Sequence, residues 1–297
     1  MSGQAKPAAT GTLAQRQVKP TSSRSVSHQP RSPHPKQPVT PPERSVYGSR
    51  LRVRDYAGRA LKPVERAVVA RLRPELARGR VLELGCGAGA ITRILLDAGA
   101  DVVGVDLSPA MVAHCRSEFP KGSFGVGDLR DLSAHPTGAY VVVVAGANVL
   151  DVASHAERPD VMAGIRRVIA DDGSFYFSTH NRSSTEAQAL ARTGPQLRRE
   201  TTVQQQVRAV AGFAIGKLNR RRLVRLQQYE DDYAILNDPA HRWGLLHHYI
   251  TREAEEHELR SAGFELVDVW AENGDRLAPE DDDSGSQELH YLAKAVR

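Results

Sequence analysis

The sequence predicts an α/β fold built on a mostly parallel sheet with helices on both of its faces. Apolar runs of strand length, such as 101–106 and 140–145, alternate along the chain with segments of helical pattern. A turn rich in glycine, residues 85–89, stands between the first strand and the helix that follows it. Strands that alternate with helices are typical of parallel sheets, whose ligands bind at the carboxyl ends of the strands.

The elements are expected in a regular order from residue 62 onward. Helices are predicted at 62–77, 90–98, 108–116 and 158–169, and strands at 81–84, 101–106, 124–126, 140–145 and 174–179. Ser108 and Pro109 supply an N-cap and a first-turn proline for one of these helices. The run Asp171-Asp172-Gly173 predicts the helix stop and turn before the strand at 174–179.

The glycine-rich turn predicts a ligand site. Gly85, Gly87 and Gly89 alternate directly after a buried strand, and glycines at this spacing let bare N–H groups approach a ligand. Gly85, Gly87 and Ala90 also satisfy the G-x-G-x-x-G/A pattern of dinucleotide-binding folds. The glycines alone therefore fit NAD, S-adenosylmethionine or a tight turn without a ligand.

Acidic residues follow the next two strands. Asp106 comes 19 positions after Gly87, at the end of the second predicted strand, where a carboxylate can accept both ribose hydroxyls of a nucleoside. Asp128, in Gly127-Asp128-Leu129 after the third strand, is placed to accept from an adenine amino group while Leu129 packs on the ring.

These features together resemble the class I S-adenosylmethionine-dependent methyltransferases, over about residues 50–297. Glu83 stands just before the glycines, where this family keeps an acidic residue, and Gly127-Asp128-Leu129 is similar to its adenine-binding turn. Residues 263–269 and 288–295 resemble its last two strands. The resemblance implies a Rossmann-like sheet of seven mostly parallel strands, a C-terminal antiparallel hairpin and S-adenosylmethionine as cofactor.

The resemblance also implies the residues that bind the cofactor. The expected set is Tyr56, Glu83, Gly85, Gly87, Gly89, Asp106, Leu107, Met111, Asp128, Leu129 and Ala145. Glu83 and the glycines would hold the methionine part, Asp106 the ribose and Asp128 the adenine amine. Leu107, Met111 and Leu129 would cover the adenine faces, and Tyr56 would cap the methionine carboxylate.

A helical insert, about residues 182–250, is expected between the fifth strand and the final hairpin. In this family such insertions commonly cover the acceptor and exclude water, so we expect a substrate-recognition lid. Its arginines, 220–222 and Arg225, are expected near an anionic or polar substrate, or else on a solvated helix paired with Asp231 and Asp232.

Methyl transfer requires mainly that the acceptor atom is aligned with the methyl group in a pocket without water. An acceptor atom that carries a proton also needs a general base to remove it. Histidine titrates near neutrality. His180, just after the fifth strand, and His247 and His248, in the insert, are the candidates. The alternative for each is a hydrogen-bonded structural histidine.

Several other chemistries are not predicted. Cys86 and Cys115 have neither a disulfide framework nor the position of a nucleophile for carbon methylation. The chain lacks an Asn/Asp-Pro-Pro-aromatic turn after strand 140–145. Asn148, Asp151 and Asn181 offer only one carboxylate among them, which is too few to predict a metal.

The positive charge is concentrated at the N-terminus. Residues 1–50 carry eight Lys or Arg residues and one acidic residue, against a net charge of +5 for the whole chain. Residues 1–45, rich in Pro and Ser, are expected to be a disordered basic tail, and 46–297 the methyltransferase domain. No apolar run is long enough for a membrane span, so we expect a cytoplasmic protein without a membrane partner.

The expected function is transfer of a methyl group to an oxygen or nitrogen of a small-molecule acceptor. Two alternatives stay open. One is an RNA or protein methyltransferase recruited by the basic segments, although nucleic acid is not the favoured partner. The other is an S-adenosylmethionine-binding module without catalysis. The residues carry no signal for an oligomeric state.

Overall fold

The structure, a computed structural model, describes residues 1–3, 50–190, 192–197, 199 and 201–296. The chain is divided between two units, Met1–Val39 and Thr40–Arg297, and every element given below belongs to the second. The tail expected over 1–45 lies outside the described residues, apart from residues 1–3.

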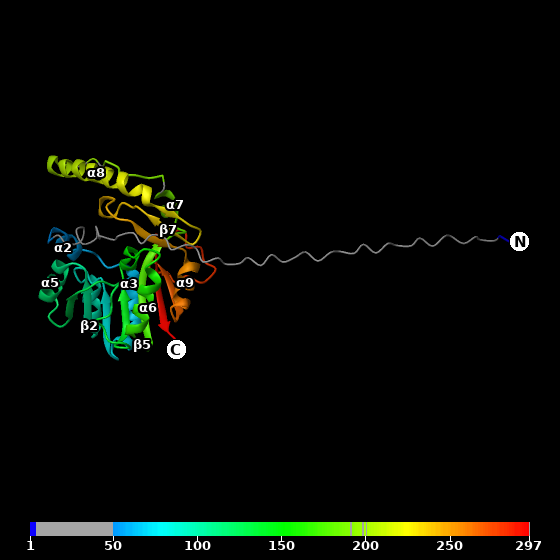
Figure 1. Cartoon of the computed structure of the whole chain (residues 1–297), viewed down its shortest axis with the longest axis horizontal. Helices are drawn as coiled ribbons and strands as arrows, with labels where there is room; N and C mark the ends of the chain where they lie inside the picture. The colour runs from blue at the N-terminus through cyan, green and yellow to red at the C-terminus, as the bar shows by residue number, and fades with distance from the viewer. Residues whose placement is uncertain (4–49, 191, 198, 200, 297) are drawn as a thin grey trace. The chain divides into compact units, whose positions relative to one another are not determined.

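A mostly parallel sheet forms the centre of the second unit (Figure 1). Its strands are β1 (Arg80–Leu84), β2 (Asp101–Asp106), β3 (Ser123–Val126), β4 (Tyr140–Ala145), β5 (Ile169–Asn181), β9 (Phe264–Ala271) and β10 (Glu288–Ala295). Neighbours in the order β3-β2-β1-β4-β5 are parallel, and β10 runs antiparallel to both β5 and β9. The predicted seven-stranded core with its C-terminal hairpin is confirmed, and the five parallel strands end at one rim.

Helices cover both faces of this sheet. They are α3 (Pro63–Leu76), α4 (Ala90–Asp97), α5 (Pro109–Glu118), α6 (Arg158–Val168) and α9 (Arg252–Ser261), and α2 (Arg50–Ala57) contacts α5. Side chains alternate along a strand, so adjacent residues of β4 enter different cores. Val142 packs in the buried cluster with α3 and α4, and Val143 packs in the cluster with α6 and α9.

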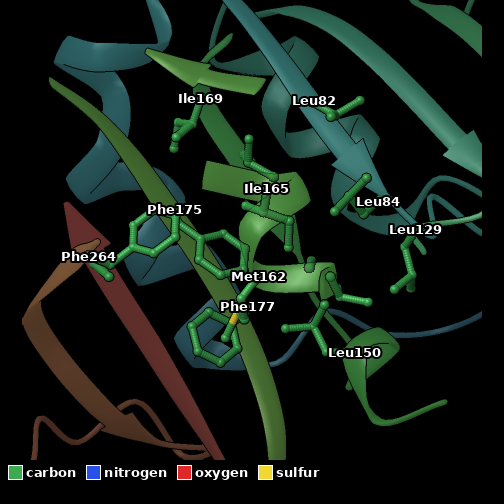
Figure 2. Packing of buried hydrophobic residues seen from close by; sticks show 14 of the residues in the cluster. Leu82, Leu84, Leu129, Leu150, Met162, Ile165, Ile169, Phe175, Phe177 and Phe264 are labelled. Carbon is green, nitrogen blue, oxygen red and sulfur yellow. The ribbon is translucent and has the colours of Figure 1, made fainter. Parts of the chain in front are cut away.

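The core on the α6 side fixes the ends of the central strands (Figure 2). Phe175 and Phe177 of β5 stack with ring centroids 4.6 Å apart, and Phe175 lies 5.4 Å from the ring of Phe264 on β9. Met162 and Ile165 of α6 are buried in the same cluster. Burying an apolar side chain of this size contributes about 1.5–3 kcal/mol to the free energy of folding. The strand ends that form the rim are therefore held in place by a well-packed core.

The local signals for helix ends are confirmed, with one difference at β5. The hydroxyl of Ser108 accepts a hydrogen bond from the backbone N–H of Met111 at 3.3 Å, which caps α5. α6 ends at Val168, and β5 begins at once with Ile169 rather than at 174. The reason is that Ile169 pairs with Tyr140 before an irregularity in the β4–β5 ladder.

The insert was predicted to be helical, but it contains three short strands in addition to its helices. Its elements are α7 (Thr185–Leu190), α8 (Val203–Leu223), β6 (Gln228–Tyr229), β7 (Tyr233–Leu236) and β8 (His247–Ile250). Aromatic and β-branched residues in β7 and β8 favour strands, but strands this short leave little periodic signal. The three strands extend the sheet to ten strands within the described part of the chain.

β8 covers the carboxyl end of β4. It runs parallel to the tip of β5, with His180 opposite Tyr249 and Asn181 opposite Ile250. β10 occupies the other edge of β5, where Glu288 is opposite His180. β8 therefore continues the sheet on the β4 side, beyond Ala145, the last residue of β4. Figure 1 shows β7, α7 and α8 gathered at this end of the sheet.

The longest described helix is α8, at 21 residues. Neither α8 nor any other helix in the described ranges is long and apolar enough to cross a membrane.

Candidate functional site

The three glycines of the turn after β1 have positive φ angles, but they serve different purposes. A Cβ added at Gly85 would lie 2.2 Å from Val149, and one added at Gly89 would lie 2.1 Å from the ring of Phe119. A Cβ at Gly87 would meet nothing nearer than the carbonyl oxygen of Gly85, at 4.0 Å. Gly85 and Gly89 are therefore required by packing, whereas Gly87 faces open space that a ligand can fill.

Asp106 holds this turn from the end of β2. Its Oδ2 accepts from the N–H of Gly87 at 2.9 Å, and its Oδ1 accepts from the N–H of Ser108 at 2.8 Å. Burial raises the pKa of Asp106, although both hydrogen bonds oppose the shift. The carboxylate is half-buried and each oxygen has a free lone pair, as the expected ribose contact requires.

Glu83 lies beneath the turn. It is 3% exposed, and its Oε2 accepts from the hydroxyl of Thr92 at 2.5 Å. Burial raises the pKa of Glu83 to about 8, against the hydrogen bonds from Thr92. A buried carboxyl of this kind is stabilised in its charged form by a cation beside it, so the residue suits the ammonium group of a methionine moiety.

The remaining residues predicted to bind the cofactor lie on helices, on β4 and in the loops that follow β2 and β3. Met111, Leu129 and Ala145 are buried, whereas Tyr56, Leu107 and Asp128 are half-buried. Sequence reasoning missed Arg130, whose guanidinium donates to both carboxylate oxygens of Asp128 at 2.9 Å. The adenine contacts of Asp128 and Leu129 stay predictions.

A histidine and an aspartate pair at the ends of β4 and β5. Asp151 lies in the turn η1 (Val149–Val152) after β4. Its Oδ2 accepts from Nδ1 of His180 at 2.6 Å and from the N–H of His180 at 2.8 Å, while Oδ1 accepts from the hydroxyl of Thr179 at 2.5 Å. Asp151 is fully buried and the side chain of His180 is 21% exposed.

This pairing defines the chemistry of His180. Because the ionised carboxylate only accepts, Nδ1 carries the proton and Nε2 presents a lone pair. Nε2 has no hydrogen-bond partner among the described residues. Burial lowers the pKa of His180, but the hydrogen bond and charge of Asp151 outweigh it, so the pKa lies above the ordinary value of 6.5. A general base needs an oriented imidazole of this kind, and the catalytic role of His180 stays a prediction.

A second pair of the same kind comes from the insert. Nδ1 of His247 donates to Oδ2 of Asp238 at 2.6 Å, and the hydroxyl of Tyr249 donates to the same oxygen at 3.0 Å. The ring of His180 stacks on Tyr249 with centroids 4.6 Å apart and on His247 with centroids 5.5 Å apart. The structure therefore brings two predicted histidines, His180 and His247, together.

His248 is not part of this group, because neighbouring residues of a strand point to opposite faces. It shares a hydrogen bond with His155, between Nε2 and Nδ1 at 3.1 Å, and stacks at 5.5 Å on Tyr233. Burial, with the positive charge of Arg158, lowers the pKa of His248 far below its ordinary value. The structure assigns it to the contact between the insert and the core.

Asp151 also lies beside a buried cluster of charged side chains that is centred on Arg158. Arg158 of α6 donates to Glu255 at 2.6 Å and to Glu258 at 2.8 Å, both on α9, and lies 3.8 Å from Asp151. Its side chain is 2% exposed. Among the residues the structure describes, no group of three or more His, Cys, Asp or Glu side chains is arranged to hold a metal ion.

The arginines of the insert differ from one another. Arg220 donates to the carbonyls of Leu190 and Asn237, both at 3.0 Å, and its guanidinium lies over the ring of Trp243 at 4.6 Å. Arg222 and Arg225 are exposed. Arg220 therefore holds α8 against the rest of the insert, and a substrate contact by the other arginines stays a prediction.

Sequence reasoning missed Asp238 and considered Asp151 only as a metal ligand. The turn Asn237-Asp238-Pro239 carries an aspartate before a proline, a signal for a turn but not for a histidine partner.

Comparisons with known proteins agree with this geometry. The family model described as a methyltransferase domain matches residues 81–173. A ubiquinone biosynthesis O-methyltransferase from Xanthomonas oryzae pv. oryzae is 34% identical over 142 residues, which are 46% of this chain and 56% of that protein. One of the same name from Methylococcus capsulatus is 31% identical over 113 residues, 36% of this chain and 46% of its own. The chain spans about half the length of these relatives.

Solved structures share the fold. The CcbJ methyltransferase from Streptomyces caelestis has a TM-score of 0.55 at 19% identity, covering 85% of this chain and 98% of its own. An S-adenosylmethionine-dependent methyltransferase from Clostridium acetobutylicum has a TM-score of 0.56 at 14% identity, covering 82% and 95%. The 1,6-didemethyltoxoflavin-N1-methyltransferase of Burkholderia thailandensis, solved with its acceptor and S-adenosylhomocysteine, has a TM-score of 0.53 at 16% identity, covering 85% of each chain.

The strand order, the turn after β1 and the sequence match over residues 81–173 lead to one conclusion. Residues 81–173 match a methyltransferase-domain family, and the chain has the fold of the class I S-adenosylmethionine-dependent methyltransferases.

Proposed function

We propose that the protein transfers a methyl group from S-adenosylmethionine to a hydroxyl group of a small-molecule acceptor. The pairing of His180 with Asp151 carries the proposal, because it places an oriented base at the carboxyl end of β5. The glycine-rich turn after β1 lies at the same rim of the sheet. The names of the curated relatives, which are O-methyltransferases, support an oxygen acceptor.

The residues of the turn fit the cofactor. Gly87 faces open space, Asp106 presents a half-buried carboxylate, and Glu83 offers a buried carboxyl to a cation. When bound, S-adenosylmethionine supplies a methyl group that passes to the acceptor oxygen while the electron pair of the C–S bond stays on sulfur. The protein has to position the acceptor, exclude water and remove one proton.

His180 removes that proton. Nε2 accepts it from the acceptor hydroxyl, while Nδ1–H remains bonded to Asp151, which keeps the tautomer and stabilises the imidazolium that forms. The proton then leaves to solvent through the exposed part of the His180 side chain.

The insert covers the acceptor side of the site. Residues 247–250 are buried and lie beyond the end of β4, so β8 forms a wall beside His180. A water-excluding wall strengthens the electrostatic interactions within the site. The substrate-recognition role of residues 182–250 rests on this placement.

The direct test uses the full-length protein and calorimetry with S-adenosylmethionine. Wild-type protein should bind it, and Asp106→Ala should bind at least tenfold more weakly. Asp101→Ala is the matched control, because it removes an exposed carboxylate from the start of the same strand. No binding by the wild type, or undiminished binding by Asp106→Ala, would overturn the proposal.

The acceptor is tested by mass measurement of methyl transfer to a panel of hydroxylated and amino metabolites, with total RNA and protein included. A hydroxylated product that gains one methyl group supports the proposal. Transfer to an amine alone, or to RNA alone, would contradict the hydroxyl acceptor.

A further inference from the structure

His180 lies between two carboxylates that come from different parts of the chain. On one side Asp151, from the turn after β4, bonds Nδ1 directly at 2.6 Å. On the other side the ring stacks on Tyr249 and His247, both of which donate to Asp238 of the insert. The core and the insert thus each supply a charged group to one imidazole.

Asp238 is held as firmly as Asp151. Its Oδ2 accepts from His247 and Tyr249, and its Oδ1 accepts from the N–H of Ala240 at 2.9 Å. The residue is 4% exposed. Burial alone would raise the pKa of Asp238, but the hydrogen bond and charge of His247 lower it overall, so the carboxylate stays ionised.

The loop that carries Asp238 is also fixed. The side-chain amide of Asn237 donates to the carbonyls of Trp243 at 2.9 Å and Leu245 at 2.6 Å. These bonds close the loop between β7 and β8. The distance from Asp238 to the strand that carries His247 and Tyr249 is therefore set by the fold of the insert.

We propose that the insert completes the base of the site: Asp238, acting through His247 and Tyr249, is a positioning residue that holds the ring of His180 against Asp151 and stabilises the imidazolium formed when His180 takes a proton. This inference rests on the proposed function of His180. In this proposal the insert both excludes water from the acceptor and positions the base that removes its proton.

The charged and titratable groups around His180 determine the direction of the effect. They are Asp151 from η1, Asp238, His247, His248 and Tyr249 from the insert, Glu288 from β10, and Arg158 behind Asp151. The carboxylates favour the imidazolium, and burial opposes it. Loss of the charge of Asp238 should therefore lower the pKa of His180 and weaken it as a base.

The test is a ¹⁵N NMR titration of the histidine rings in the full-length protein with S-adenosylhomocysteine, in which His180→Gln identifies the His180 signals. In Asp238→Asn the midpoint of His180 should fall by about one pH unit. The acidic limb of the pH dependence of kcat should move down by a similar amount, with the plateau reduced several-fold. Asp231→Asn, which removes an exposed carboxylate from the turn between β6 and β7 of the same insert, should leave both unchanged.

A second variant covers the case in which Asp238→Asn does not fold. His247→Phe keeps a ring in the stack but removes one of the donors to Asp238 and with it a main cause that lowers the pKa of Asp238. Less negative charge should then face His180, so the midpoint of His180 should fall as well. An unchanged midpoint in the folded variant overturns the inference. The titration needs no acceptor, so a shifted midpoint without methyl transfer would contradict only the proposed function. An unshifted midpoint in an active enzyme would contradict only the role of Asp238.

Discussion

The rings of His180 and Tyr249 stack with centroids 4.6 Å apart because the two residues are opposite each other where β8 runs parallel to the tip of β5. Only two residue pairs join these strands. The insert therefore contacts the core of the sheet at the candidate base. A substitution in either strand at this contact should alter the surroundings of the His180 ring.

His180→Gln should lower kcat by about 10²–10⁴-fold, the usual contribution of a general base. Its affinity for S-adenosylmethionine should stay unchanged, because the turn after β1 does not involve this residue. In the wild type, kcat should rise with pH through a midpoint above 6.5, since the pKa of His180 is raised. Steady-state kinetics across pH, with calorimetry for the cofactor, provide the check.

His257→Gln serves as the control for this measurement, because His257 is exposed on α9. Full turnover in His180→Gln, or an equal loss in both variants, would remove His180 from the mechanism.

Gly87→Ala and Gly89→Ala should separate ligand binding from packing. At Gly87 a methyl group has room, so the cost is the strain of a positive φ, about 1–2 kcal/mol, while the cofactor loses the space above the turn. At Gly89 the methyl group would collide with Phe119. We expect Gly87→Ala to weaken cofactor binding at least tenfold with a small change in Tm, and Gly89→Ala to lower Tm far more.

Thermal unfolding and calorimetry of the two glycine variants give the comparison. If Gly87→Ala binds S-adenosylmethionine as well as the wild type does, the space above Gly87 is not the cofactor site.

Glu83→Gln should stabilise the ligand-free protein at pH 8 but weaken cofactor binding. Burial raises the pKa of Glu83 to about 8, from an ordinary value of 4.5. Between these pH values the folded state keeps a proton that the unfolded state has lost, so stability falls as pH rises. Glutamine removes this titration and can still accept from Thr92.

The Tm difference between Glu83→Gln and the wild type should therefore grow from pH 5 to pH 8, by about 2–4 °C for each kcal/mol recovered. A difference that does not depend on pH would contradict the raised pKa. Cofactor affinity that survives the substitution would remove Glu83 from the methionine site.

Arg158→Met should destabilise the protein by about 3–5 kcal/mol, because it leaves Glu255 and Asp151 buried without their cation. Arg93→Met is the control: its ion pair with Glu118 is exposed, and such pairs contribute about 0–1 kcal/mol. Urea unfolding measures both. Adding Glu255→Gln to Arg158→Met should recover part of the loss, and no recovery would argue against an uncompensated charge as the cause.

The fold could be predicted from local patterns. The strand 140–145, the cap at Ser108 and the glycine turn each depend on residues close together in the chain, and each was confirmed. Because the carboxyl ends of parallel strands meet at one rim, the order of elements was enough to bring Glu83, Asp106 and His180 to the same side of the sheet.

The site around His180 could not be predicted in the same way. Its pairing with Asp151 spans 29 positions and depends on where β4 ends. Strands as short as β7 and β8 show no clear alternation of apolar and polar residues, so the insert was expected to be helical. No local pattern indicated which of His247 and His248 would face His180.

The sequence by itself determined the parallel sheet, the glycine turn and the acidic residues at the strand ends, because these follow from side-chain periodicity and backbone freedom. Only the tertiary structure decided which histidine receives which carboxylate. The register of β8 against β5 turns His247 toward His180 and His248 toward His155. A shift of that register by one residue would exchange them, since side chains alternate between the two faces of a strand.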